Sequence, residues 1–236
     1  MNKNIIIAGK EFSKNTKVDQ LAKQAGLTTF ITTRPTAKNS EKPEFSLTSW
    51  NRNSPISARN IVVNAENQLG KIDGAVLFFD TSAYNQIFTE TKLEDFDRAC
   101  SELILSYNFL ATEIIKRFTK TQHGLIFFVL QEMQTNAEFL KLSSREQLAN
   151  PERALPIASM AQAAFKAFAE NMAASLLKDT ETFVYLLEAK RTTSENQIIE
   201  WISKKLEEPN PVYKTSKQAV TWLTVDEKSK FPFIKG

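Results

Sequence analysis

Side chains that act as nucleophiles or bind transition metals are scarce in this sequence. It contains one histidine, His123, and one cysteine, Cys100, so these residue types cannot form a zinc site between them. A serine–histidine–aspartate triad would have to use His123, and no Gly-x-Ser-x-Gly motif accompanies it. Cys100 lies in the apolar pattern of a long helix, where we expect a buried, unreactive thiol. The sequence excludes an intramolecular disulfide, and we expect no metal site.

Glycines, which let a backbone approach phosphate closely, are also few. The chain has 6 glycines in 236 residues, whereas average usage of about 7% would give roughly 16. A nucleotide-binding loop depends on glycine at its tight turns. This scarcity is the first indication that a phosphate-binding loop of the usual kind is absent.

Short apolar runs alternate with helical patterns along the whole chain. The strand-like runs are residues 4–8, 28–33, 45–49, 74–79, 124–130, 182–187 and 219–225. Helical periodicity occurs at residues 16–25, 56–69, 92–118, 155–177 and 196–206. This alternation predicts a seven-stranded, mainly parallel sheet with helices on both faces. Because no repeat or linker interrupts it, we expect residues 1–236 to form a single Rossmann-like, doubly wound α/β domain.

The bulk composition argues against several classes of protein. No apolar run approaches the roughly 20 residues needed to span a bilayer, and the run Ile5–Ile7 is too short for a signal-peptide core. We therefore expect a cytoplasmic protein without membrane association. The net charge is +3 and the pI about 8.8, but no basic stripe with interleaved aromatic residues occurs, so we do not expect nucleic-acid binding.

One segment departs from the alternating pattern. Residues 132–153 carry few regular signals, although Phe139, Leu140 and Leu142 lie within them. An irregular connection of this length in a compact domain is typical of a lid or binding loop. We expect an irregular, lid-like insertion here, with a plain surface excursion as the alternative.

Four segments, in the same order as the predicted elements, resemble short-chain dehydrogenases/reductases. Residues 69–77, Leu-Gly-Lys-Ile-Asp-Gly-Ala-Val-Leu, resemble the Gly-x-Ile-Asp-x-Leu-Val segment that opens the family's fourth strand. Residues 96–98, Phe-Asp-Arg, resemble the Trp-Asp-Arg that opens its long fourth helix, and residues 124–126 resemble the Gly-x-Ile before its fifth strand. Residues 161–176 follow the pattern of its Ala-rich helix. The resemblance covers nearly the whole chain and implies a Rossmann-like fold with NADP(H) or NAD(H) as cofactor.

The positions that bind the cofactor in that family are mostly altered here. Its first loop reads Thr-Gly-x-x-x-Gly-x-Gly, and the matching stretch keeps only Gly9 and places Ser13 and Asn15 at the other two glycines. Free N–H groups at the following helix still attract an anion, and Lys10 supplies positive charge either to a phosphate or simply to solvent. Arg34 ends the second strand, where relatives that prefer NADP often place an arginine.

Phe79 falls in the family's Asn-Asn-Ala-Gly segment, which shapes the wall beside the adenosine. A phenylalanine there crowds that wall or packs into the core. The residues that the resemblance assigns to a cofactor crevice are Gly9, Lys10, Ser13, Asn15, Arg34 and Phe79.

The family's catalytic positions hold residues that cannot perform its chemistry. Its asparagine aligns with Leu103, its serine with Gln131 (or with Leu130 one residue earlier), its tyrosine with Ala158 and its lysine with Gln162. The tyrosine is the general acid/base, and the lysine lowers its pKa. Alanine has no proton to give and glutamine has no charge, so we assign no catalytic residue. Residues 213–217 match Tyr-x-x-x-Lys literally, but they precede a strand-like run, whereas the family motif begins a helix.

Two functions remain open from the sequence. We favour a catalytically degenerate relative that acts as an interaction, scaffold or ligand-sensing protein, with no cofactor and with room for a small-molecule ligand. The alternative is a divergent NAD(P)-dependent oxidoreductase whose acid/base group is Asp80, Gln131, Tyr107 or a residue of 132–153. Under either, the resemblance implies a homodimer or homotetramer that pairs through the helices at 92–118 and 155–177.

Overall fold

A seven-stranded parallel sheet forms the centre of the protein in a computed structural model. The model describes residues 3–10, 18–33, 47–87, 92–149, 152–178, 181–190, 193–208 and 220–225. The strands lie in the order β3-β2-β1-β4-β5-β6-β7, and each neighbouring pair is parallel. They are β1 (Lys3–Ala8), β2 (Leu27–Thr33), β3 (Leu47–Ser49), β4 (Gly74–Asp80), β5 (Gly124–Gln131), β6 (Thr182–Ala189) and β7 (Leu223–Thr224). This arrangement confirms the predicted Rossmann-like α/β fold.

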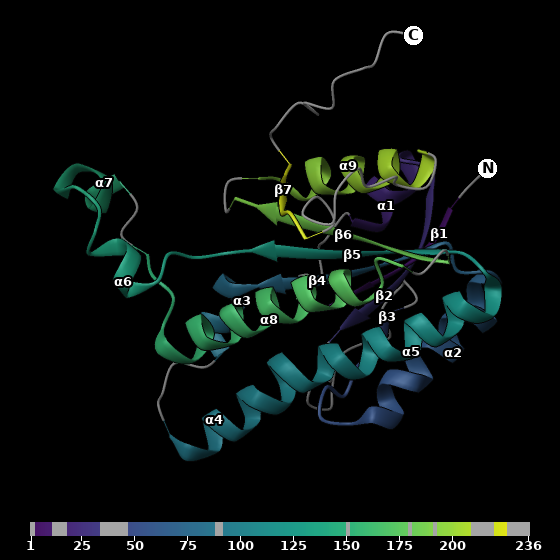
Figure 1. The fold of residues 1–236 in the computed structure, drawn as a ribbon, viewed down its shortest axis with the longest axis horizontal. Coiled ribbons are helices and arrows are strands. Elements are labelled where there is room, and N and C mark those ends of the chain that lie inside the picture. Colours follow the sequence, from purple (N-terminus) through teal and green to yellow (C-terminus); the bar gives the residue numbers. More distant parts are fainter. Residues whose placement is uncertain are drawn as a thin grey trace, which may run out of the picture.

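Helices cover both faces of the sheet (Figure 1). The described helices are α1 (Val18–Gln24), α2 (Pro55–Leu69), α3 (Thr81–Ile87), α4 (Leu93–Ala99), the π-helix η1 (Cys100–Leu105), α5 (Ser106–Thr121), α6 (Asn136–Phe139), α7 (Ser144–Ala149), α8 (Pro156–Ser175) and α9 (Glu195–Glu207). One buried cluster joins the sheet to α2, α5 and α8. A second joins its other face to α1 and α9. Both faces of the sheet are therefore buried, which explains why β4 and β5 are continuous apolar runs.

The long helix predicted at 92–118 is present, but it is not uniformly α-helical. It runs through α4, η1 and α5, and the Ser106 Oγ donates a hydrogen bond to the Glu102 carbonyl, 2.6 Å away, where the π turn ends. Cys100, expected to be buried, is exposed. That expectation was wrong because Ala99 and Leu103 are the residues here that point into the core, which leaves Cys100 outside the buried face of the helix.

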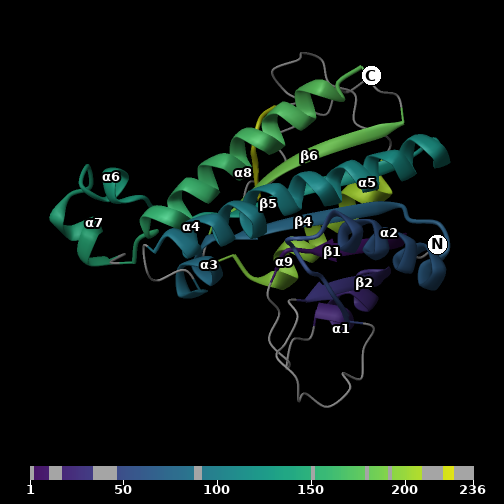
Figure 2. The same ribbon diagram turned by 90° about the horizontal axis from the view of Figure 1, so that it is seen from below.

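Two further segments differ from the sequence prediction. Within 132–153, expected to be irregular, the structure forms α6 and α7, which project from the end of β5 (Figure 1 and Figure 2). A capping box between Thr135 and Glu138 starts α6. The last strand, expected at 219–225, contains only two residues, because Trp222 turns toward α8 and its Nε1 donates to the Glu170 Oε1, 2.7 Å away. Among the described helices, none combines the length and apolarity needed to cross a membrane.

Candidate functional site

The strand order reverses between β1 and β4, and this point defines where a site is expected. From β1 the chain proceeds to β2 and β3 on one side, then returns to add β4 on the other. In open α/β sheets, ligands bind in the crevice beyond the carboxyl ends of the strands at such a switch point. Gly9 and Lys10 follow β1, and Asp80 ends β4. These residues therefore lie at the mouth of the crevice.

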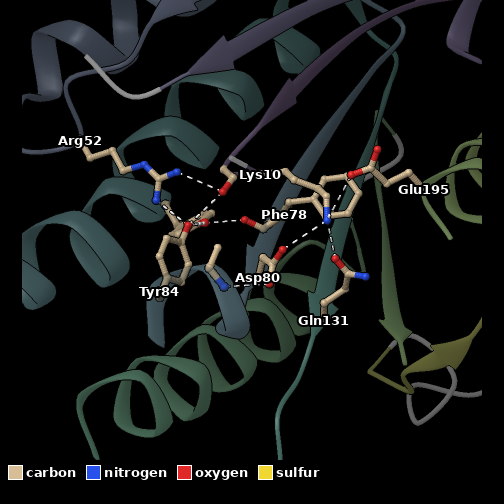
Figure 3. Close-up of polar contacts among 10 residues, drawn as sticks. Lys10, Arg52, Phe78, Asp80, Tyr84, Gln131 and Glu195 are labelled. Atoms are coloured by element: carbon tan, nitrogen blue, oxygen red, sulfur yellow. Dashed lines mark hydrogen bonds and ion pairs between the residues drawn. The ribbon is translucent and has the colours of Figure 1, made fainter. Parts of the chain in front are cut away.

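The Lys10 side chain bridges the switch point (Figure 3). Its Nζ lies 2.6 Å from the Gln131 Oε1, 3.2 Å from the Asp80 Oδ2 and 3.6 Å from the Glu195 Oε1. Lys10 is only 7% exposed, and its Nζ lies 5.5 Å from the centre of the Phe78 ring. One ammonium group thus links the ends of β1, β4 and β5 to the start of α9.

A polar cavity of about 350 Å³ opens beside this lysine. Its lining comes from the ends of β1, β4 and β5, from α3 and from the start of α9. The lining residues are Lys10, Asp80, Ser82, Gln131, Glu132, Met133, Thr193, Ser194 and Glu195. The volume is at the small end of the range typical of ligand pockets.

Glu132 is the lining residue whose protonation is most perturbed. Partial burial, a hydrogen bond to the Glu188 carboxyl on β6 and the charge of Glu188 raise the pKa of Glu132 to about 7. The Lys166 Nζ on α8, 3.8 Å from the Glu132 Oε2, opposes this shift without cancelling it. One carboxyl group that holds its proton to near neutrality therefore lines the cavity.

Beside the cavity, Gly9 is tightly enclosed by backbone and by a tyrosine. Its φ is +95°, in the region that favours glycine. A Cβ at this position would collide with the Phe78 carbonyl oxygen and would lie 2.6 Å from the Tyr107 hydroxyl. A glycine at this position therefore permits close packing of the end of β1 against β4 and α5.

A buried arginine fills the space next to Gly9. The Arg52 Nη2 donates to the Gly9 carbonyl, 3.0 Å away, and its Nη1 donates to the Tyr84 hydroxyl. The Tyr84 and Tyr107 hydroxyls are 2.7 Å apart, and the Tyr107 hydroxyl donates to the Phe78 carbonyl. Arg52 is 4% exposed, so this network forms part of the interior.

The four positions aligned with the family's tetrad have structural roles. Leu103 and Ala158 are fully buried and apolar. The Gln162 Oε1 accepts hydrogen bonds from the Thr81 hydroxyl at 2.7 Å and the Met133 N–H at 3.1 Å, and its Nε2 donates to the Met133 carbonyl. Gln131 holds Lys10. None of the four positions thus presents a titratable side chain.

The structure brings together some of the residues that the sequence assigned to the crevice and separates others. Gly9 and Lys10 lie at the switch point. Phe79 does not line the cavity: its ring is fully buried and packs 4.8 Å from Tyr84 and 5.0 Å from Phe165, centre to centre. Ser13, Asn15 and Arg34 lie outside the described residues, as does the Tyr-x-x-x-Lys match at 213–217.

Sequence reasoning missed the partners of the site. Arg52 and Tyr84 come from a short polar stretch after β3 and from a helix, α3, that the sequence analysis did not predict. Glu195 received no role, because the predicted helix began at residue 196. The capping box formed by Ser194 and Gln197 marks the start of that helix in the sequence, but it does not show which way Glu195 points.

Sequence comparison finds a relative of similar length but unstated function. No family model matches the chain. A protein of Treponema pallidum (strain Nichols), described only as uncharacterized, is 22% identical over 232 residues, covering 98% of this chain and 96% of its own length.

Solved structures of short-chain dehydrogenases share the fold at low identity. One from Mycobacterium smegmatis aligns with a TM-score of 0.61 and 11% identity, covering 96% of this chain and 92% of its own. An enoyl-[acyl-carrier-protein] reductase (NADH) from Aquifex aeolicus VF5 gives 0.58 and 12%, covering 94% of each chain. An apo SCOR enzyme from Clostridium thermocellum gives 0.57 and 16%, covering 88% and 87%. The fold is that of the short-chain dehydrogenases/reductases, as the resemblance predicted.

Proposed function

We propose that this protein is a non-enzymatic member of that fold, which binds a small polar molecule in the Lys10 cavity and acts as a ligand-responsive or scaffold oligomer in the cytoplasm. One observation carries the proposal: the Lys10 ammonium bridges the switch point to Asp80 and Gln131. A ligand bound across the switch point would have to displace the Lys10 ammonium from these two partners.

A dinucleotide does not fit the described part of the crevice. Its diphosphate needs bare backbone and unopposed N–H groups beside it. Here Asp80 is the last residue of β4, and the carboxylate of Glu195 lies 3.6 Å from the Lys10 Nζ. Two carboxylates facing one already partnered lysine repel a diphosphate rather than attract it.

The side chains that transfer a proton in that family are also absent from the matching positions. Ala158 has no proton to donate, and the Gln162 amide is held on both sides by Thr81 and Met133. The Tyr107 hydroxyl donates to a backbone carbonyl inside the core, so it is not available to a substrate. We therefore derive no hydride or proton transfer from these positions.

Titration with NADPH and with NADH, followed by cofactor fluorescence, tests the proposal. We expect no saturable binding of either cofactor up to millimolar concentration, with circular dichroism confirming that the protein is folded. Saturable binding at micromolar concentration would overturn the proposal.

One observation favours a second candidate, a divergent NAD(P)-dependent oxidoreductase. Glu132 lines the cavity and, with a pKa near 7, can hold a proton at neutral pH. If this candidate is correct, NADPH must support reduction of a carbonyl compound, and Glu132→Gln must reduce kcat at least tenfold without weakening cofactor binding. If no member of a panel of aldehydes and ketones supports NADPH oxidation, the oxidoreductase candidate is wrong.

We also propose that the protein forms a homodimer or homotetramer through the helices at 92–118 and 155–177. Large apolar side chains are exposed on them: Leu93 is 81%, Leu105 46% and Met160 38% exposed. The helices that carry these residues, α4 with η1 and α8, lie side by side (Figure 2). A continuous surface that includes them would bury these side chains against a second copy.

A further inference from the structure

We infer that the Lys10 cavity is a binding site for a small organic cation that carries a primary ammonium group. This inference rests on the proposed function, in which the cavity holds a small polar ligand, and it specifies the ligand's charge.

The charge of the cavity lining favours a cation. Among the residues that line it, Asp80, Glu132 and Glu195 are acidic and Lys10 is basic. Asp80 and Gln131 already hold the Lys10 ammonium, and its distance to Glu195 is the longest of the three. Of the two carboxylates near Lys10, Glu195 is therefore the less neutralised, and it is half-buried, where a charge pair is screened less than at the surface.

A buried hydroxyl points independently to a ligand. Thr193 lines the cavity and is 6% exposed, yet its Oγ1 has no hydrogen-bond partner within the described part of the chain. Leaving a buried polar group unpaired costs about 1–3 kcal/mol. An ammonium group with three N–H donors can satisfy this oxygen and a carboxylate at the same time.

The size of the cavity limits what enters. A volume of about 350 Å³ corresponds to about twelve water molecules at roughly 30 Å³ each. A short diamine or amino alcohol fits this volume, whereas a dinucleotide does not.

Protonation of Glu132 couples this site to pH. The groups that face Glu132 are Glu188 on β6, Lys166 on α8 and Glu138 on α6. Burial and the two acidic neighbours keep the carboxyl protonated to near neutrality, and a cation bound beside it would favour the ionised form. The affinity for an ammonium ligand should therefore rise as the pH increases from 6 to 8.

Isothermal titration calorimetry with three molecules of similar length but different charge tests the inference. These are 1,4-diaminobutane, 1,4-butanediol and succinate, each added to the full-length protein at pH 7.5. We expect diaminobutane to bind at least tenfold more tightly than either of the other two. Glu195→Gln should weaken it at least fivefold, and Glu132→Gln should abolish the pH dependence.

The matched control is Glu200→Gln, an exposed carboxylate farther along α9, which should leave the affinity unchanged. Tighter binding of succinate would assign the site to anions through Lys10, and equal binding of butanediol would make it a site for neutral alcohols. Either result, or no binding of any of the three, overturns the inference. The proposed function is judged separately by the NADPH titration, so the two can fail independently.

Discussion

Replacing Gly9 with alanine tests how tightly the end of β1 is packed at the switch point. The new Cβ would collide with the Phe78 carbonyl oxygen, which belongs to backbone and cannot rotate away. It would also lie 2.6 Å from the Tyr107 hydroxyl, and displacing that hydroxyl would break its bonds to Phe78 and Tyr84.

Two costs add in this variant. A φ of +95° is unfavourable for alanine by about 1–2 kcal/mol. Overpacking a rigid site adds about 1–3 kcal/mol. Gly9→Ala should therefore lower the free energy of unfolding by about 2–5 kcal/mol.

Gly26→Ala is the matched control, because it isolates the first cost. Gly26 also has a positive φ, +74°, but apart from its chain neighbours no atom of the described residues lies within 4 Å of the position of its Cβ. Gly26→Ala should therefore lower the free energy of unfolding only by the conformational cost, about 1–2 kcal/mol. Urea unfolding followed by far-ultraviolet circular dichroism measures both variants. If the two lose equal stability, the enclosure of Gly9 by Phe78 and Tyr107 has been misjudged.

Three further predictions concern the interior, the carboxyl pair and the helix surface. Arg52→Ala should destabilise the fold by about 2–4 kcal/mol, because it removes two hydrogen bonds from a charged group to buried oxygens; a midpoint of urea unfolding equal to that of the wild type would contradict this. Glu132, with a pKa raised from 4.5 to about 7, keeps in the folded state a proton that the unfolded chain releases. Stability should therefore fall as pH rises from about 4.5 to about 7, and Glu132→Gln should flatten this slope in urea titrations; an unchanged slope would exclude the effect. In light scattering, the double substitution Leu105→Glu and Met160→Glu should yield monomers, whereas Leu148→Glu, on the projecting α7, should leave the assembly intact. Wild-type protein with the mass of one chain would refute the proposed oligomer.

The strands could be predicted from the sequence because both faces of the sheet are buried. Every residue of β4 except the last is buried, so its apolar run could not be confused with a surface strand. The length of the edge strand β7 could not be predicted in this way. This strand is short because Trp222 turns to Glu170 on α8. A hydrophobic run at the edge of a sheet does not reveal how far strand pairing continues.

The site was predicted only in outline. Alignment with the family's first loop placed Gly9 and Lys10 at the crevice. For Lys10, however, the surrounding sequence predicted only a residue that attracts phosphate or lies in solvent. Its burial depends on Asp80 and Gln131, which lie 70 and 121 positions away along the chain. No local pattern encodes such pairings, and the same is true of the contact between Arg52 and Tyr84.

The bridge made by Lys10 also bears on how the chain reaches its native state. Its partners come from β4, β5 and α9, so the ammonium finds its full set of acceptors only after most of the polypeptide has emerged and the sheet is aligned. Contacts of such wide sequence separation form late, because loop closure must come first. Pairing of the Lys10 ammonium with all of its acceptors is thus a marker of completed folding. A nascent chain that stops before Glu195 would lack one of the two carboxylates that lie near this lysine.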